Sequence, residues 1–306
     1  MISFRYHLVS IIGVFLAIAL GVVIGTSALN GAVVGDLRRQ VSDLNRSGAA
    51  ATDRNASLQA QAGNADLLAQ TFGAKIAGSA LAKTPVVILG APGAPKSMKD
   101  AVAAAITGAG GTVAARLQLS KDFDDPKRAN DIRSLATASG VHPIGLQLPS
   151  TDDPGVLAGA LLGYVLFGHG QGTDLTQVLA GFNTLNMLST EGAPATAGKA
   201  LVLVAPGGLA KDDGGGALLL SFGTELGTVG GPSVIAGDSA SATQAGLVAL
   251  VRGSDGAKKA LSTVDDATGP LGQLTVSLAV ADALAGRRGN YGTATGADGL
   301  LPGVAN

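Results

Sequence analysis

Soft metal ions are bound in proteins by thiolate, thioether and imidazole side chains, and this sequence contains few of them. It has no Cys, three Met and three His residues, and none of the His residues has a second His, Cys or Met at ligand spacing. A metal site would therefore have to be assembled by the fold, and the candidates for it are His142, His169 and Met187.

Pairs of carboxylates can act as a general acid and a general base, and adjacent Asp residues occur at 124–125, 152–153, 212–213 and 265–266. Adjacent side chains seldom converge on one substrate atom. Asp125 and Asp153 are each followed by Pro, which is typical of a helix N-cap with Pro in the first turn. We therefore predict caps and loop positions, no catalytic residue and no enzyme.

A glycine-rich loop, Gly168-His169-Gly170-Gln171-Gly172, resembles a phosphate-binding turn. The dinucleotide pattern needs a third Gly where Thr173 stands, although Glu191 lies near the offset of a ribose-binding acid. A connection between two helices is the simpler interpretation, with nucleotide binding as the alternative. No cofactor-binding residue is predicted.

Composition narrows the classes of partner. The 306 residues carry 21 Lys and Arg against 22 Asp and Glu, so the chain lacks the basic excess of a nucleic-acid surface. Hydrophobic residues make up 46%, enough for a packed core. Charged residues make up only 14%, against about 25% in an ordinary soluble domain. Nucleic acid is excluded as an expected partner. The low share of charged residues indicates either a membrane protein or a GC-rich genome that favours Gly and Ala codons.

One segment accounts for much of the missing charge, because no Asp, Glu, Lys or Arg occurs from Leu8 to Gly35. Within it, residues 8–29 would form about 33 Å of helix, enough to cross a bilayer. A cleaved signal peptide is the alternative, with small residues at 26–28, but its apolar region is typically only about 7–15 residues. We predict an uncleaved signal anchor at 8–29 after a cytoplasmic stub at 1–7.

The orientation follows weakly from the basic residues that flank the helix. Arg5 precedes it, and Arg38, Arg39 and Arg46 follow it, which argues against export of the C-terminal domain. Long domains are translocated largely regardless of charge. We therefore expect a single-pass protein with its C-terminal domain on the extracytoplasmic side, in contact with membrane lipid.

Small residues repeat every four positions inside this helix, which allows close helix pairing in lipid. The predicted dimer face consists of Gly13, Ala17, Gly21 and Gly25.

From residue 30 to 78 the sequence predicts a helical coiled-coil stalk. The 4, 3 spacing of a coiled-coil seam is followed by Leu37, Val41, Leu44 and, two heptads later, Leu58. Continued to Phe72, the register is filled mostly by small residues. A single amphipathic helix folded against its own domain is the alternative. A paired stalk that continues a membrane dimer face predicts a homodimer.

Beyond residue 79, short apolar runs alternate with helical segments, which is typical of a doubly wound, mostly parallel sheet. The expected strands are 85–89, 112–119, 200–205, 233–236 and 261–264, with a helix at 96–107 and a mainly helical region at 122–190. The first and third strands both end in Ala-Pro-Gly, which leaves an internal duplication open. We assign 79–288 to this α/β domain and 289–306 to a flexible tail.

Distinctive motifs lie near both ends of the chain. The N-terminal motif is Phe4-Arg5-Tyr6-His7-Leu8-Val9-Ser10, followed by residues 14–17 and the end of the helix at 21–25. The C-terminal motifs are Ser262-Thr263-Val264-Asp265-Asp266 and Gly289-Asn290-Tyr291-Gly292. In these motifs the chain resembles the actinobacterial MctB family of copper transport proteins. At position 290 we expect the family to favour His.

The resemblance implies an envelope protein of actinobacteria with a role in copper export or homeostasis, and it raises the outer membrane as a location. Copper is implied by the resemblance alone. SteB-like relatives are associated with cell separation and act with a membrane partner, SteA, which influences peptidoglycan hydrolysis. The alternative function is therefore a non-enzymatic dimeric scaffold that binds a membrane partner. A channel fits poorly, because one membrane helix encloses no pore except in a higher oligomer.

Overall fold

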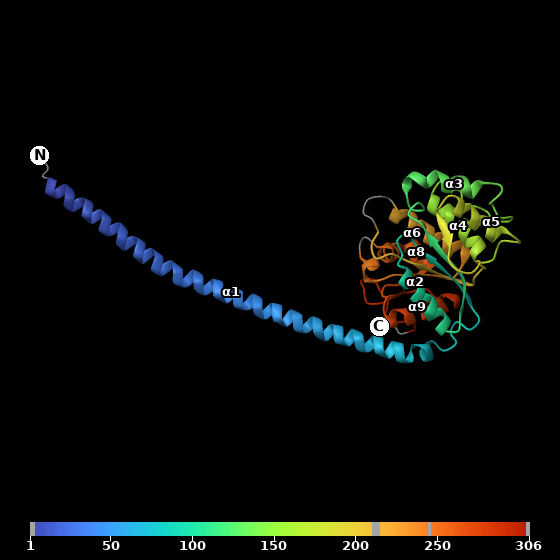
Figure 1. Cartoon of the computed structure of the whole chain (residues 1–306), viewed down its shortest axis with the longest axis horizontal. Helices are drawn as coiled ribbons and strands as arrows, with labels where there is room; N and C mark the ends of the chain where they lie inside the picture. The colour runs from blue at the N-terminus through green and yellow to red at the C-terminus, as the bar shows by residue number, and fades with distance from the viewer. Residues whose placement is uncertain (1–3, 210–214, 244–245, 304–306) are drawn as a thin grey trace. The chain divides into compact units, whose positions relative to one another are not determined.

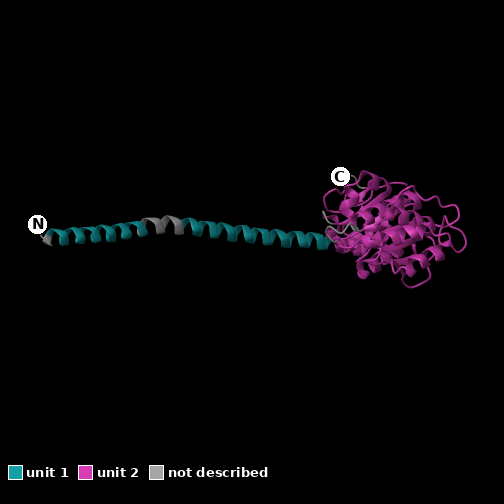
Figure 2. Cartoon of the chain, turned by 90° about the horizontal axis from the view of Figure 1, so that it is seen from above, with its two compact units in different colours: residues 1–64 teal, residues 65–306 magenta. Residues whose placement is uncertain are grey.

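Figure 1 shows a computed structural model of the chain, which describes residues 4–209, 215–243 and 246–303. Two compact units are found, residues 1–64 and 65–306 (Figure 2). Helix α1 (Phe4–Ala77) begins in the first unit, and its last turns belong to the second. Among the described residues, Tyr6–Thr26 is the segment long and apolar enough to cross a bilayer. This confirms the predicted apolar N-terminal helix.

The length of α1 has a simple sequence cause. The first Pro of the chain is Pro85, so no residue before it lacks the backbone N–H that a helix needs. The helix ends where Gly78 adopts a φ of +51°, a left-handed conformation that is typical of helix C-termini.

The second unit contains a seven-stranded sheet in the order β3-β2-β1-β4-β5-β6-β7. Neighbouring strands are parallel except β3, which is antiparallel to β2. This confirms the predicted doubly wound, mostly parallel sheet and its five expected strands. The strands are β1 (Pro85–Gly90), β2 (Thr112–Leu119), β3 (Leu188–Thr190), β4 (Ala200–Val204), β5 (Ser233–Ala236), β6 (Leu261–Val264) and β7 (Asn290–Tyr291).

Helices cover both faces of the sheet. One apolar core lies between the sheet and α2, α9 and the end of α1, and the other lies between the sheet and α3 to α8. The helices are α2 (Lys96–Gly108), α3 (Ala129–Thr137), α4 (Pro154–Leu166), α5 (Asp174–Thr184), α6 (Gly215–Glu225), α7 (Leu247–Arg252), α8 (Asp255–Ala260) and α9 (Pro270–Leu284), with short turns of helix at Pro126–Arg128, Leu226–Gly230 and Ser239–Ala242.

Helix α4 is buried on almost every side, because it is apolar throughout and packs closely on α6. A Cβ atom on Gly159 would lie 2.7 Å from the carbonyl oxygen of Phe222, so only glycine allows this approach. Asp153 caps the helix, since its side chain accepts hydrogen bonds from the N–H groups of Gly155 and Val156. Asp125 caps the turn at Pro126–Arg128 in the same way, so both predicted Asp-Pro caps are confirmed.

Two segments differ from the expected organisation. The region 122–190, expected to be mainly helical, ends in β3, which hydrogen-bonds to the edge of β2. The segment expected as a flexible tail from 289 contributes β7 to the sheet, and the backbone N–H of Asn290 donates to Asp298 at 2.7 Å. Pairing with β6 and these polar contacts order the segment, and neither leaves a periodic pattern in the sequence.

Candidate functional site

The carboxyl ends of β1 and β4 form the place where the sheet changes winding direction, because β2 lies on one side of β1 and β4 on the other. Gly90 pairs with Val204, and the N–H of Ala91 donates to the Val204 carbonyl at 2.9 Å. The two Ala-Pro-Gly turns, at 91–93 and 205–207, therefore follow neighbouring strands. Doubly wound proteins bind ligands at this switch point.

A polar cluster lies beside the end of β1. The ammonium group of Lys99, whose side chain is only 2% exposed, donates to Gln118 Oε1 at 2.6 Å and to Glu191 Oε1 at 2.5 Å. A Cβ on Gly90 would come within 2.3 Å of Gln118 Oε1, so a larger residue there would displace the Gln118 side chain that Lys99 contacts. Glu191, considered above as a ribose-binding acid, is paired with this lysine.

The outer part of the cluster is also paired. Asp100 accepts hydrogen bonds from Lys96 and Arg116, and these bonds lower the pKa of its carboxyl group to about 2. Arg116 Nε and Glu191 Oε2 are buried without a hydrogen-bond partner, 3.9 Å apart. β2 supplies Arg116 and Gln118 to this cluster, and the ammonium of Lys99 and the guanidinium of Arg116 are each engaged by a carboxylate, with Gln118 Oε1 also accepting from Lys99.

A second network joins the two C-terminal segments that carry the family resemblance. Asp265, fully buried, accepts from Arg252 Nη1 at 2.8 Å, from the N–H of Thr293 at 2.9 Å and from that of Ala294 at 3.0 Å. A Cβ on Gly292, whose φ is +128°, would lie 2.1 Å from Asp265 Oδ1. This motif therefore clamps the C-terminal segment onto β6.

Asn290 belongs to the same clamp. Its Oδ1 accepts from the hydroxyl of Thr263 at 2.9 Å, and its Nδ2 donates to Asp298 at 3.2 Å. The side chain at the position where we expected His thus has a structural role between β6 and the segment that follows β7.

The candidate metal ligands lie in three different settings. Met187 is fully buried in the core on the α3 to α8 side. The ring nitrogens of His142 lie 3.4 Å and 3.1 Å from the carbonyl oxygens of Ala136 and Leu146. His169 Nε2 lies 3.2 Å from the carbonyl oxygen of Gly230. Within the described ranges, no group of three or more His, Cys, Asp and Glu residues is placed to hold a metal ion.

The glycine-rich loop at 168–172 connects α4 and α5. It follows a helix and not a strand, so it lacks the context of a dinucleotide-binding turn, as the simpler interpretation predicted. Of the paired carboxylates, Asp125 and Asp153 are caps, and the pair at 212–213 lies outside the described residues.

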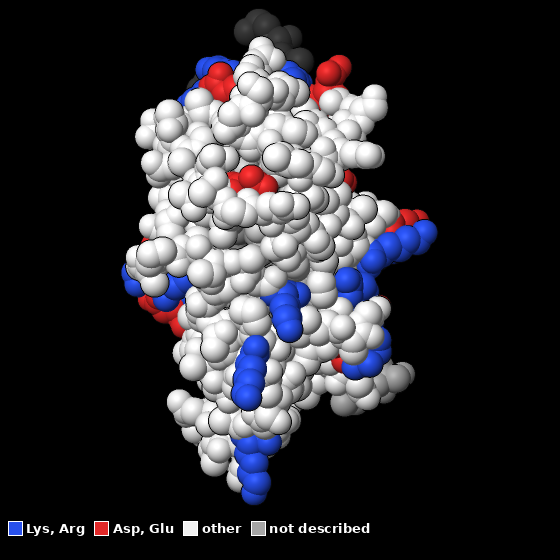
Figure 3. Space-filling view, turned by 90° about the vertical axis from the view of Figure 1, so that its right-hand side faces the viewer, with Lys and Arg blue, Asp and Glu red and all other residues white. Residues whose placement is uncertain are grey.

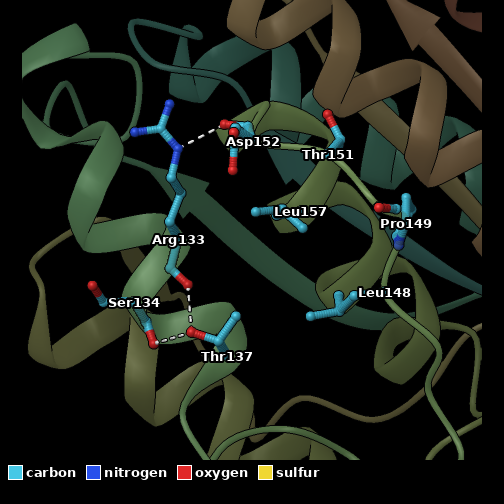
Figure 4. Close-up of a pocket in the computed structure, with 9 residues that line it drawn as sticks. Arg133, Ser134, Thr137, Leu148, Pro149, Thr151, Asp152 and Leu157 are labelled. Carbon is cyan, nitrogen blue, oxygen red and sulfur yellow. Dashed lines mark hydrogen bonds between the residues drawn. The ribbon is translucent and has the colours of Figure 1, made fainter.

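An open cavity of about 500 Å³ lies between α3 and the segment before α4 (Figure 4). Arg133 Nε donates to the Asp152 carbonyl at 2.6 Å, and Leu148 and Leu157 supply apolar lining. Figure 3 shows one whole face of the α/β domain, which is mostly uncharged. A few acidic atoms lie in a hollow in the upper half of this view, and several Lys or Arg side chains lie in the lower half. The cavity could admit a small ligand, and the hydroxyl group of Thr137 in its lining donates to the Arg133 carbonyl at 3.0 Å.

The three glycines of the predicted stripe have open space around them within one chain. A Cβ atom added at Gly13, Gly21 or Gly25 would meet nothing within 4 Å. A larger side chain would therefore fit within a single copy of the helix.

The predicted stalk seam is also exposed. Leu37, Val41, Leu44 and Leu58 are 59%, 50%, 71% and 55% exposed. Two ion pairs lie at other helix positions and repeat after seven residues: Asp36 with Arg39 at 3.1 Å and Asp43 with Arg46 at 3.4 Å. Leu37 and Leu44, like the two ion pairs, are thus seven residues apart, a spacing that is typical of a coiled coil.

These features define a membrane-anchored α/β protein with a single N-terminal apolar helix. The family described as "Copper transport outer membrane protein, MctB" matches residues 1–302. The chain belongs to this MctB family and is a membrane-associated member of it. The family description names transport and no enzymatic reaction.

Similar proteins come from mycobacteria. Copper transporter MctB of Mycobacterium tuberculosis (strain ATCC 25618 / H37Rv) is 32% identical over 308 residues, which cover 97% of this chain and 98% of the relative. Copper transporter MctB of Mycobacterium leprae (strain TN) is 31% identical over 316 residues, covering 98% and 99%.

Proposed function

We propose that this chain is a membrane-anchored component of copper export or homeostasis in the cell envelope, with its α/β domain on the extracytoplasmic side. The observation that carries the proposal is the match to proteins named copper transporters over nearly the entire length of both chains. The Tyr6–Thr26 helix supports attachment to the membrane.

The donor chemistry of the chain favours an indirect role. Copper sites in proteins use Cys, Met and His ligands, and this chain has no Cys and three each of Met and His. If copper contacts the α/β domain directly, His142, His169 and Met187 are the donors to test. We favour a dimeric scaffold that positions other components, and the exposed seam with its heptad ion pairs supports pairing of the stalk.

The copper content of cells tests the proposed role in copper export or homeostasis. A host that lacks this protein should accumulate copper and grow poorly at copper concentrations that the parent tolerates, and the full chain should restore both. Unchanged copper content in the deletion strain would contradict a role in export.

Direct binding is tested on the purified full chain loaded with copper. Fewer than about 0.1 copper ions per chain, with no shift in melting temperature, would exclude it, because a ligand that binds the folded state must stabilise it. If copper is retained, Met187→Leu should reduce it. The matched control is Met98→Leu, since Met98 is also buried but lies in the core on the opposite face of the sheet.

A second candidate is a scaffold for a membrane-protein partner in cell separation, which the exposed helix surface favours. It predicts daughter cells that stay joined after division, with normal copper content. A deletion strain with raised copper and normal separation would favour the copper role.

A further inference from the structure

Exposed apolar side chains are concentrated on one short stretch of the second unit. Among its described residues, the large hydrophobic side chains that stay exposed are Leu67, Leu68, Phe72, Ile76, Ile144 and Leu300. Four of these six lie on the last turns of α1. Phe72 is 48% exposed, and Leu68 and Ile76 are 60% and 59% exposed.

A neighbouring side of this stretch, about 100° around the helix from Leu68, Phe72 and Ile76, is held against the α/β domain. Ala69 and Ala77 are buried in the core on the α2 and α9 side. A Cβ on Gly73 would lie 3.9 Å from the side chain of Leu274, and Asp66 accepts a hydrogen bond from the N–H of Leu271. These contacts set the rotation of the helix, so Phe72 cannot turn inward.

The heptad register of the stalk, continued to the end of α1, assigns Ala69, Phe72 and Ile76 to the seam. Phe72 and Ile76 are exposed, as a seam requires, but Ala69 is only 7% exposed because it packs against the α/β domain. Leu68, four residues before Phe72, completes the exposed row. The stalk seam therefore continues onto this stretch, with Leu68 in place of Ala69.

We propose that Leu68, Phe72 and Ile76 form a two-fold contact with the same residues of a second copy of this chain. The inference rests on the dimer proposed above and extends it to the α/β domain. Two copies inserted through the same N-terminal helix run in the same direction from the membrane. A two-fold axis then brings each residue opposite itself.

The size of the surface agrees with a contact that extends another interface. Aromatic side chains bury on the order of 150–250 Å² each, so the three half-exposed side chains of this row contribute at most roughly 300 Å² per chain. A stable interface buries about 800 Å² per partner. This face therefore supplies roughly a third of what a dimer needs, and the stalk seam is the natural source of the remainder.

Disulfide trapping in membranes tests the contact on the full-length protein. The chain has no Cys, so every cross-link reports the introduced residue. Phe72→Cys and Ile76→Cys should form dimers at least several-fold faster than Thr71→Cys, an exposed neighbour that faces another direction. Leu44→Cys reports the stalk seam independently.

The outcomes distinguish the proposed stalk dimer from the proposed contact at the end of α1. Trapping at Leu44→Cys, with Phe72→Cys no faster than Thr71→Cys, would overturn this contact and leave the stalk dimer standing. Trapping at neither position would overturn both. An adduct of Phe72→Cys with a different protein would replace the second copy as the occupant.

A second variant guards against local misfolding. Phe72→Asp combined with Ile76→Asp places charges on an exposed face, so the melting temperature should stay near that of the parent chain while Leu44→Cys trapping slows several-fold. Unchanged trapping would contradict the contact.

Discussion

The carboxylate of Asp66, near the end of α1, accepts a hydrogen bond from the backbone N–H of Leu271 in the first turn of α9, at 3.2 Å. The N-cap of α9 is Gly269, which has no side chain to satisfy this N–H. A residue 205 positions earlier thus supplies the cap and ties the two helices together.

Asp66→Ala should lower the free energy of unfolding by about 1 kcal/mol, the usual loss for a helix cap. Urea titration of the full chain measures it. The control is Asp53→Ala, which removes an exposed carboxylate from the same helix and should leave the unfolding midpoint unchanged. Equal effects of the two substitutions would mean that the cap contributes nothing.

Asp266 should make stability depend on pH in the direction opposite to most carboxylates. Burial raises the pKa of its carboxyl group, and the neighbouring Asp66, Asp265 and Asp238 raise it further. The folded state therefore binds this proton more tightly than the unfolded chain does. Ionisation at neutral pH opposes folding, and the penalty disappears as the pH falls below the ordinary value near 3.8.

Asp266→Asn should accordingly raise the melting temperature at pH 7, and its advantage over the parent chain should vanish near pH 3.5. Asp255→Asn is the control, because the hydrogen bond from Lys258 lowers the pKa of Asp255 and its removal should not stabilise the protein. An advantage of Asp266→Asn that is independent of pH would contradict the argument.

The buried clamp between β6 and the C-terminal segment should tolerate substitution less well than an exposed ion pair does. Asp265→Ala leaves the guanidinium of Arg252, 4% exposed, buried without its carboxylate, which typically costs about 3–5 kcal/mol. The midpoint of urea unfolding measures the loss. An exposed pair offers the comparison, since Asp255→Ala removes the partner of Lys258 and should leave the midpoint unchanged.

The sequence predicted those parts of the fold that have a hydrophobic period or a characteristic turn residue. Residues 85–89 and 200–205 are continuous apolar runs bounded by Pro and Gly, and both are central parallel strands. The parallel sheet followed from their alternation with helices.

The missed elements depend on long-range contacts. β3 has only three residues and exists because it pairs with β2, and β7 has two residues held by β6 and by Asp298. The Lys99 and Glu191 pair joins positions 92 residues apart, which no local pattern indicates. Ala69 was assigned to the stalk seam because a heptad pattern does not show which face meets the domain.

Lys99 and Glu191 should respond unequally to substitution. Glu191→Ala leaves a buried ammonium without its carboxylate, and we expect a loss of about 3 kcal/mol. Lys99→Met keeps the buried alkyl chain, and Glu191, 31% exposed, gains access to water, so the loss should stay below about 1 kcal/mol. Equal losses in urea unfolding would show that the two side chains contribute only through their mutual attraction.

The membrane stripe is tested by enlarging its small residues. In a single copy, a Cβ on Gly21 or Gly25 meets nothing within 4 Å, so Gly21→Ile with Gly25→Ile should leave insertion and the α/β domain unaffected. If two helices pack along this stripe, the added side chains force them apart, and disulfide trapping through Leu37→Cys should slow at least several-fold. Val22→Ile with Val23→Ile, which enlarges residues next to the stripe, is the matched control. Equal trapping in both double variants would place the membrane contact on another face of the helix.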